Sequence, residues 1–389
     1  MAQAKVDQIK IEPFTINAGE EVLKDLRERL GRTRWPGEVP DTGWEYGTNL
    51  AYLRELIEYW RTKYDWRKHE AELNRFKHFR TTIDGLGIHF IREEGRGPNP
   101  KPLLLSHGWP GSICEFMQII PMLTDPAAHG ADPNQSFTVI APSLPGYGFS
   151  DHPRARGMNI QGIAEIFHKL MTEVLGYERY CAQGGDWGSA ITSRLGEAHS
   201  DSLYGIHLNL VFAGNRRDRA AELTEEEKIF LADMDHFQRE ESGYQGIQST
   251  KPQTLAYGLN DSPAGLAAWI VEKFRTWSDC GGDVEKRFTK DQLLTNVMIY
   301  WITQSINSST RLYYEARHHP WRPDKTKRIE TPTAAALFPR EIGKPPRDWA
   351  EQAFNIQQWT VMPRGGHFAA MEEPKLLADD IRNFFSKMK

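Results

Sequence analysis

The chain has 389 residues, which is long enough for one large domain with an inserted or appended subdomain. Apolar residues make up 39% of it and charged residues 26%, as in ordinary soluble globular proteins. The formal net charge is −4 and the isoelectric point lies near 6.4, whereas a nucleic-acid or anionic-membrane partner would favour clustered Lys and Arg. We therefore expect a small-molecule partner, with no nucleic acid and no membrane.

The cysteines indicate a reducing compartment. Cys114, Cys181 and Cys280 are odd in number, far apart and without the spacing of a metal site. Residues 1–8 contain no apolar run, so the sequence predicts neither a signal peptide nor a membrane anchor. We expect a cytoplasmic protein that binds no metal.

The first part of the chain, residues 1–95, reads as an amino-terminal segment that completes the fold. Leu23, Leu26 and Leu30 are spaced as one face of a helix, and apolar residues between 50 and 60 predict a second helix. Residues 79–94 alternate around a glycine-containing turn, which predicts a β-hairpin where the sheet begins.

Next comes a pattern of short apolar strand, loop and helix. Strands are predicted at residues 102–106, 136–141 and 178–183, and a helix follows each of them. Such a pattern is typical of a doubly wound parallel sheet, in which ligands lie beyond the carboxyl ends of the strands. The loops at 107–112 and 142–150 and the turn at Asp186 should therefore converge on one place.

After a further strand at 203–210 the strand pattern stops until about residue 334. The intervening residues 215–330 are rich in aromatic side chains and predict helices at 225–239, 265–277 and 293–305, which we interpret as a lid over the site. The sheet resumes at 333–338 and 360–362, and an amphipathic helix at 376–385 follows. The expected division is thus 1–95, core 96–214, lid 215–330 and core 331–389.

Residues 184–189 (Gly-Gly-Asp-Trp-Gly-Ser) have the spacing of the nucleophile elbow of an α/β-hydrolase, with Asp186 at the apex. Glycines at 184 and 188 would permit the tight backbone and the close approach of the following helix. A carboxylate attacks carbon without a base, and the ester that it forms must be hydrolysed by an activated water. The alternative is a plain turn, since Gly and Asp are common turn residues.

Chain order predicts the partners of Asp186, because in this fold the nucleophile is followed by the acid and then by the histidine. His367 lies in a glycine-rich loop between the last strand and the last helix, and Glu341 follows the strand at 334–338. Other carboxylates nearby are alternatives to Glu341: Asp324, Asp348 and Glu351.

The anionic oxygen formed during ester hydrolysis needs hydrogen-bond donors. The backbone N–H groups of Trp109 and Trp187 are expected to form this oxyanion hole. The two indole rings are expected to line the substrate pocket.

Together these stretches resemble a microsomal-type epoxide hydrolase of the α/β-hydrolase superfamily over nearly the whole chain. The resemblance rests on residues 25–36, 107–112, 184–189, 259–269 and 365–374. It implies an α/β-hydrolase fold with a mostly parallel central sheet, a helical lid insert and an amino-terminal epoxide-hydrolase segment. The resemblance does not extend to the amino-terminal membrane anchor of the mammalian members, so we do not expect membrane attachment.

The resemblance also implies roles. Asp186 would attack an epoxide carbon, and His367 with Glu341 would activate water, without a cofactor or metal. Two lid tyrosines would hold the epoxide oxygen. One is Tyr244, the last residue of the Glu-Ser-Gly-Tyr stretch at 241–244, and the other is Tyr313, with Tyr314 beside it. Spacing alone does not rank these above Tyr257 or Tyr300.

We therefore predict hydrolysis of apolar epoxides to vicinal diols through a covalent aspartyl ester, in detoxification or specialised metabolism. A haloalkane dehalogenase is the nearest alternative, because it also places tryptophan after an elbow aspartate; a non-catalytic ligand-binding hydrolase fold is another. An ester hydrolase fits less well, since Ser189 lies off the elbow apex. Exposed aromatic residues in the amino-terminal segment make a homodimer an expectation.

Overall fold

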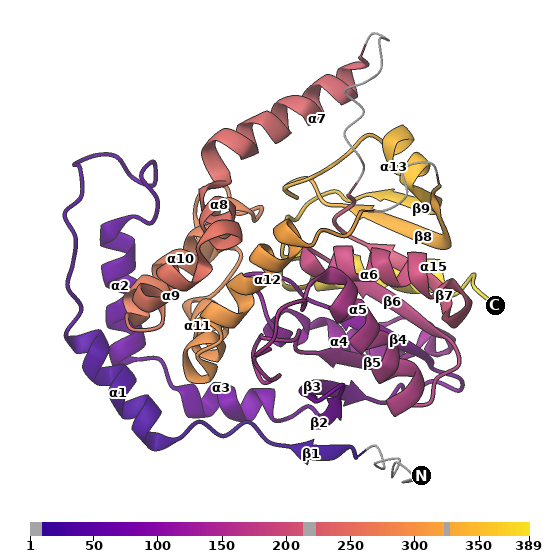
Figure 1. Ribbon diagram of the computed structural model, residues 1–389, viewed down its shortest axis with the longest axis horizontal. Helices are drawn as coiled ribbons and strands as arrows, with labels where there is room; N and C mark the ends of the chain where they lie inside the picture. The colour runs from indigo at the N-terminus through magenta and orange to yellow at the C-terminus, as the bar shows by residue number, and fades with distance from the viewer. Residues whose placement is uncertain (1–9, 213–222, 323–326) are drawn as a thin grey trace.

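The computed structural model describes residues 10–212, 223–322 and 327–389. Within them the chain forms one nine-stranded sheet in the order β1-β2-β3-β5-β4-β6-β7-β8-β9 (Figure 1). The strands are β1 Glu12–Phe14, β2 His78–Ile83, β3 Leu86–Glu93, β4 Lys101–Ser106, β5 Phe137–Pro142, β6 Tyr180–Gly184, β7 Leu203–Leu208, β8 Ile329–Leu337 and β9 Phe354–Val361.

The sheet is mostly parallel, as expected. The strands from β5 to β9 in the sheet order pair in parallel, and only β1, β2 and β3 at one edge pair antiparallel. Leu103 and Leu104 in β4 are fully buried because parallel strands are covered on both faces. The predicted hairpin is β2 and β3, but β1 was not predicted, since three residues are too few for a visible alternation.

Helices cover both faces of the sheet. The helices α5 (Ile160–Lys169) and α6 (Trp187–Ala198) pack together on one face, and α4 (Ile119–Thr124) packs with α15 (Pro374–Phe385) on the other (Figure 1). The helix expected after residue 112 is divided, with a 3₁₀ turn at Ile113–Phe116 before α4. This turn lies next to the loop that follows β4.

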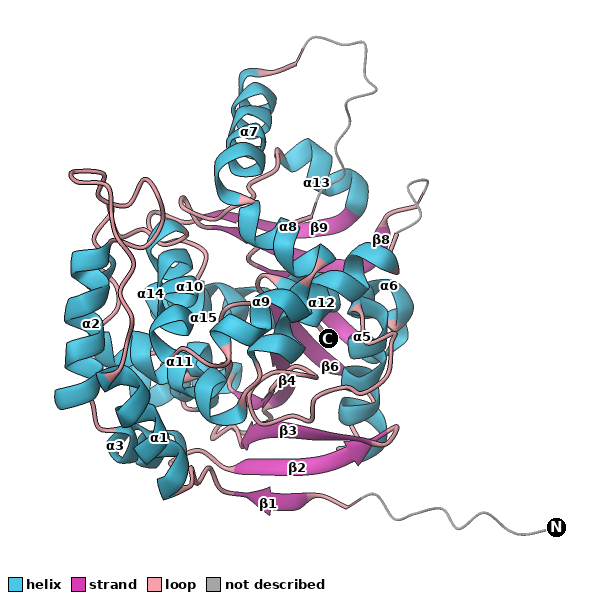
Figure 2. Cartoon of the chain, turned by 60° about the vertical axis from the view of Figure 1, so that its left-hand side comes forward, coloured by secondary structure: helices cyan, strands magenta, loops and turns pink. Residues whose placement is uncertain are grey.

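Between β7 and β8, the described residues form six α-helices, which make an insert over the carboxyl ends of the central strands (Figure 2). They are α7 Glu225–His236, α8 Gly243–Thr250, α9 Pro252–Leu259, α10 Pro263–Thr276, α11 Lys290–Thr303 and α12 Ile306–His318. From α11, Asn296 Nδ2 donates to the Pro110 carbonyl at 2.8 Å and Tyr300 donates to the Gly111 carbonyl at 2.7 Å. These bonds fix the insert to the loop after β4.

The amino-terminal segment packs on the outside of this insert. Its helices are α1 Glu20–Gly31, α2 Leu50–Thr62 and α3 Trp66–Leu73, and α1 and α2 contact α10 (Figure 1). Arg29 Nη1 donates to Asp261 Oδ1 at 2.6 Å, and the Thr48 hydroxyl donates to the Ala268 carbonyl at 2.8 Å. The segment therefore supports the insert as well as adding β1 and β2 to the sheet.

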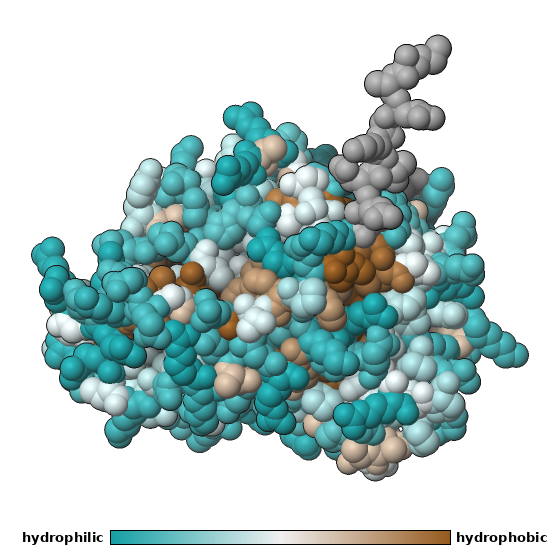
Figure 3. Space-filling view, turned by 90° about the horizontal axis from the view of Figure 1, so that it is seen from below, coloured by the Kyte–Doolittle hydropathy of each residue, from teal (hydrophilic) through white to brown (hydrophobic). Residues whose placement is uncertain are grey.

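The remaining helices are α13 Arg347–Ala353 and α14 Ala369–Glu372. Figure 3 shows a face on which hydrophilic side chains predominate and apolar ones form small patches. Among the described residues, every helix is too short or too polar to cross a membrane. The expected boundary between core and lid at 214/215 lies outside the described residues.

Candidate active site

The turn between β6 and α6 is a strained elbow with Asp186 at its apex. Asp186 has φ 51° and ψ −128°, a conformation that residues with a side chain rarely adopt. A Cβ at Gly184 would collide with the Gly188 carbonyl, and one at Gly188 would collide with the Ser106 carbonyl. Both glycines are thus required by close backbone contacts, and the elbow projects the Asp186 carboxylate toward the loop after β4.

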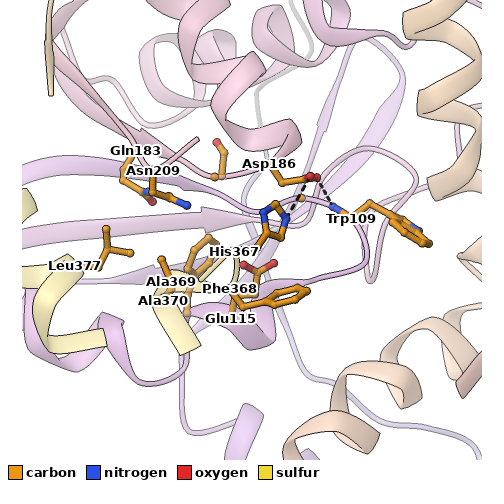
Figure 4. Close-up of a pocket in the computed structure, with 14 residues that line it drawn as sticks. Trp109, Glu115, Gln183, Asp186, Asn209, His367, Phe368, Ala369, Ala370 and Leu377 are labelled. Atoms are coloured by element: carbon orange, nitrogen blue, oxygen red, sulfur yellow. Dashed lines mark hydrogen bonds and ion pairs between the residues drawn. The ribbon is translucent and has the colours of Figure 1, made fainter. Parts of the chain in front are cut away.

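Two further loops bring an imidazole and a second carboxylate to this carboxylate; Figure 4 shows the imidazole of His367 beside Asp186. His367 Nε2 lies 3.4 Å from Asp186 Oδ2, and His367 Nδ1 lies 2.6 Å from Glu341 Oε1. The Arg340 amide donates to the Gly365 carbonyl at 3.1 Å, which joins the loop after β8 to the loop after β9. Asp186, His367 and Glu341 therefore form a chain of three interacting side chains.

The three groups act on one another strongly because His367 and Glu341 are buried and Asp186 is largely enclosed. Burial by itself lowers the pKa of His367, but the carboxylates of Glu341 and Asp186 outweigh burial and hold this pKa well above its ordinary value. With its Asp186 partner ionised, the imidazole is therefore favoured as an imidazolium.

The two alternatives to Glu341 that the structure describes do not contact the histidine. Asp348 is exposed, and Glu351 accepts a hydrogen bond from Arg347 at 2.7 Å on α13. Asp324 lies outside the described residues. Of the carboxylates considered in this region, Glu341 is the one placed against His367.

A backbone donor faces the Asp186 carboxylate. The Trp109 amide donates to Asp186 Oδ1 at 2.7 Å, so one of the two expected oxyanion donors already contacts the relevant oxygen. Trp187 begins α6, and its ring meets the Tyr313 ring edge-on at 4.8 Å between centroids. The amide of Trp187 stays a prediction as the second donor.

The tyrosines Tyr244 on α8 and Tyr313 on α12 come together above the Trp109 ring. Tyr244 stacks on Trp109 at 5.2 Å between centroids, and Tyr313 meets Trp109 edge-on at 5.8 Å. Burial is the largest cause that raises the pKa of each phenol. The Asp186 charge adds to it for Tyr244, and Tyr244 and Asp186 add to it for Tyr313. Both phenols are therefore protonated and can donate a hydrogen bond.

Other tyrosines are placed elsewhere. Tyr257 is 72% exposed, and Tyr314 stacks on His318 at the surface side of α12. Tyr300 is buried, but its hydroxyl is used in the bond to the Gly111 carbonyl. The geometry thus distinguishes Tyr244 and Tyr313 from the residues that spacing could not exclude.

Two residues of the site were not predicted from the sequence. Trp277 accepts the His367 amide through its carbonyl at 2.9 Å, and its ring packs on Tyr244 and His367. Glu115 lines the same cavity as Asp186 and His367. Its removal from water, with a smaller contribution from the Asp186 charge, raises its pKa to about 8. A charged residue within the otherwise apolar turn at Ile113–Phe116 was the available signal for Glu115.

Comparisons with known proteins agree with this geometry. Residues 11–116 match the family model described as epoxide hydrolase N terminus, and residues 101–253 match the one described as alpha/beta hydrolase fold. The two matched regions cover the amino-terminal segment and the first part of the core, including Asp186.

Full-length relatives extend the match. Epoxide hydrolase 1 of Sus scrofa is 40% identical over 413 residues, which covers 99% of this chain and 91% of the relative. The crystal structure of juvenile hormone epoxide hydrolase from the silkworm Bombyx mori superposes with a TM-score of 0.89 at 36% identity, over 98% of this chain and 95% of that one. The Aspergillus niger epoxide hydrolase structure gives 0.86 at 31% identity, over 98% and 97%. This chain therefore belongs to the microsomal-type epoxide hydrolase family and is a hydrolase with the α/β-hydrolase fold.

Proposed function

We propose that this enzyme hydrolyses apolar epoxides to vicinal diols through a covalent ester on Asp186. The observation that carries the proposal is the arrangement around Asp186: His367 and Glu341 on one side and the phenols of Tyr244 and Tyr313 on the other. The aromatic walls favour an apolar substrate, because they offer large apolar surfaces with few polar groups. The relatives named as epoxide hydrolases support the same substrate class.

In the first half-reaction the Asp186 carboxylate attacks an epoxide carbon. Oδ1 is held by the Trp109 amide, which leaves Oδ2 to form the new bond as the carbon–oxygen bond of the ring breaks. The ring oxygen takes a proton from Tyr244 or Tyr313 as its negative charge develops. The product is an alkyl ester of Asp186 with a free hydroxyl, and one phenolate remains.

In the second half-reaction water attacks the ester carbon, Cγ of Asp186. His367 Nε2 takes a proton from the water while Glu341 stabilises the imidazolium. The negative charge of the tetrahedral intermediate falls on Oδ1, where the Trp109 amide already donates. Collapse breaks the ester bond, and the two protons of the water end on the released hydroxyl and on the phenolate.

The electrostatics suit this sequence of steps. Asp186 loses its charge when the ester forms, and one of the two carboxylates that raise the pKa of His367 is then gone. His367 then releases its proton to the solvent and becomes a free base at the stage that requires one.

The phenols argue for epoxides over haloalkanes. A halide leaves as an anion and needs only N–H donors, whereas an opening epoxide needs a proton donor. Two buried, protonated phenols beside the nucleophile supply that proton.

A single turnover in heavy-oxygen water tests the proposal. Enzyme in excess is mixed with styrene oxide, and the protein and the diol are analysed by mass spectrometry. We expect heavy oxygen in the Asp186 carboxylate and a first diol that is largely unlabelled. Label that enters the diol directly, with none in Asp186, would reject the ester, and turnover of haloalkanes but of no epoxide would favour the dehalogenase.

We also expect a cytoplasmic location and a homodimer. The three cysteines are buried free thiols, which suits a reducing compartment. Tyr46 and Val39 in the amino-terminal segment are 80% and 55% exposed, so they are available to a second copy. Analytical ultracentrifugation of the wild type and of Tyr46→Ser tests the dimer.

A further inference from the structure

A small cavity lies beside the catalytic carboxylate. Its volume is about 10 Å³, which is about the space that one water molecule needs. Asp186 and His367 line it together with Glu115, Gln183 and Asn209 (Figure 4). The Asp186 side chain keeps 15% of its surface accessible, although it lies beneath the insert. The cavity therefore has about the size of one water, lies against Asp186 and offers polar partners among apolar side chains.

Glu115 is one of the polar groups on this wall that the two half-reactions have not used. Two others, Gln183 and Asn209, bond to each other, with Gln183 Nε2 donating to Asn209 Oδ1 at 2.8 Å. It projects from the 3₁₀ turn Ile113–Phe116, and its carboxyl accepts a hydrogen bond from the Gly108 amide. A Cβ at Gly111 would collide with this carboxyl, so the loop after β4 folds closely around it. The charges of Asp186, His367 and Glu341 all act on it. Glu115 thus has a fixed place next to the triad.

We propose that this cavity holds the hydrolytic water and that Glu115 is the positioning residue that orients this water toward the aspartyl ester. The inference rests on the proposed function, because it assigns Glu115 to the second half-reaction alone. Glu115 lies on the cavity side of Asp186, whereas the phenols that assist ring opening come from the insert.

The water donates one O–H to His367 Nε2 and the other to a Glu115 oxygen, so that a lone pair faces Cγ of Asp186. As the water oxygen bonds to Cγ, its proton passes to Nε2 and the carbonyl electron pair moves to Oδ1. When that pair returns, the ester bond breaks and the released diol oxygen takes the proton from His367. The second proton of the water leaves the regenerated Asp186 carboxyl for the phenolate. Glu115 is neutral at pH 7 because burial raises its pKa to about 8, so it adds no negative charge beside Oδ1.

The test separates the two half-reactions in Glu115→Ala and Glu115→Gln. Rapid quenching followed by mass spectrometry of the protein gives the rates of ester formation and ester loss with styrene oxide. In Glu115→Ala we expect ester loss to slow by at least about 10-fold while ester formation changes less than about 2-fold. The kcat and the KM should then fall together and kcat/KM should stay unchanged, because kcat/KM reports ester formation.

The conservative variant and a control decide against a merely structural role. The Gln side chain keeps an acceptor oxygen, so ester should accumulate in the order Ala, Gln, wild type. Glu70→Gln is the matched control, since Glu70 is a buried carboxylate that accepts hydrogen bonds from the Ala18 amide and Trp66 in the amino-terminal segment. It should lose stability without accumulating ester.

Two outcomes overturn the inference while the proposed function stands. One is ester formation and ester loss that slow equally in Glu115→Ala, and the other is ester loss at the wild-type rate. If Glu115→Ala does not fold, Glu115→Gln decides by the same criterion. A wild-type enzyme that turns over epoxide without any ester on Asp186 overturns both proposals, so the two failures are distinguishable.

Discussion

At the scale of single residues, the proposed mechanism makes the pairing of Asp186 with His367 the control on when the base is free. The raised pKa of His367 depends on two carboxylates, and in this mechanism only the one on Asp186 loses its charge. Because this pKa is raised in the folded state, the ion pair stabilises the fold below about pH 6.5, and the stabilisation is lost as the pH rises through the folded-state pKa.

Asp186→Asn is a neutral mimic of the ester and tests this coupling. We expect the pKa of His367 to fall in this variant, because the imidazolium loses one carboxylate neighbour and the cost of burial remains. An NMR titration of the His367 ring in wild type and variant measures the shift. A pKa that is unchanged in Asp186→Asn would show that Glu341 alone controls the base.

The two phenols should act on ring opening only. We expect Tyr244→Phe and Tyr313→Phe each to slow ester formation by about 10-fold, and the double variant by about 10²-fold or more, since one phenol partly replaces the other. Stopped-flow or rapid-quench rates of ester formation measure the effect. Tyr257→Phe is the control at an exposed position, and an equal loss there would contradict the assignment.

The sequence was sufficient for some of these residues and insufficient for others. Chain order and glycine spacing predicted Asp186 and His367, because the fold requires them at fixed points of the topology. Order could not separate Glu341 from Asp348, since both are loop or helix-start carboxylates and only the sheet geometry turns one toward the imidazole. Glu115 was missed because nothing local shows that a glutamate in a short turn lies beside a triad.

At the scale of elements, the loop that carries His367 is clamped to the insert. Glu372 on α14 accepts hydrogen bonds from the Asp279 amide at 2.8 Å and from the Phe368 amide at 3.1 Å. Burial raises the pKa of Glu372 to about 7, which marks it as deeply enclosed. One side chain therefore holds the segment after α10 against the loop after β9.

Removing this clamp should cost stability. We expect Glu372→Ala to lower the free energy of unfolding by about 2–4 kcal/mol, because one buried and one partly buried amide lose their acceptor. Urea unfolding followed by fluorescence measures it. Glu351→Ala removes a partly exposed partner of Arg347 and should cost less than about 1 kcal/mol. Equal effects of the two substitutions would contradict the clamp.

The insert shows why helices were harder to predict than strands. The sequence predicted helices at α7, α10 and α11 but missed α12 and the two short helices α8 and α9. Pro252 begins α9, which has 8 residues and so only about two turns of pattern. The break between α11 and α12 falls at Gln304 with φ 53°, where a glycine would have been the usual signal.

At the scale of the whole molecule, the amino-terminal segment is part of the scaffold of the insert. Leu56 in α2 is fully buried in the main hydrophobic core, although α2 lies far from Asp186 in the chain. Its contacts stabilise the helices over the site without touching the reacting groups.

Leu56→Ala should therefore separate stability from chemistry. We expect a loss of about 2–5 kcal/mol in the free energy of unfolding from the cavity that it leaves, with kcat at low temperature nearly unchanged. Chemical denaturation and steady-state assays measure the two quantities. Val39→Ala, at a 55% exposed position, is expected to change stability by less than about 0.5 kcal/mol. A large fall in kcat for Leu56→Ala would show that the segment shapes the site itself.

The bond between the His367 amide and the Trp277 carbonyl has a consequence for how substrate enters. The base is attached to the sheet through Glu341 and to the insert through Trp277 and Glu372. A hinge opening of the whole insert would pull the imidazole away from Asp186 and expose the ester to bulk solvent. We therefore expect an epoxide to enter and a diol to leave through movements of side chains or single helices, which keep the triad intact. Selectivity among epoxides would then depend on the width of this passage as well as on the geometry at Asp186.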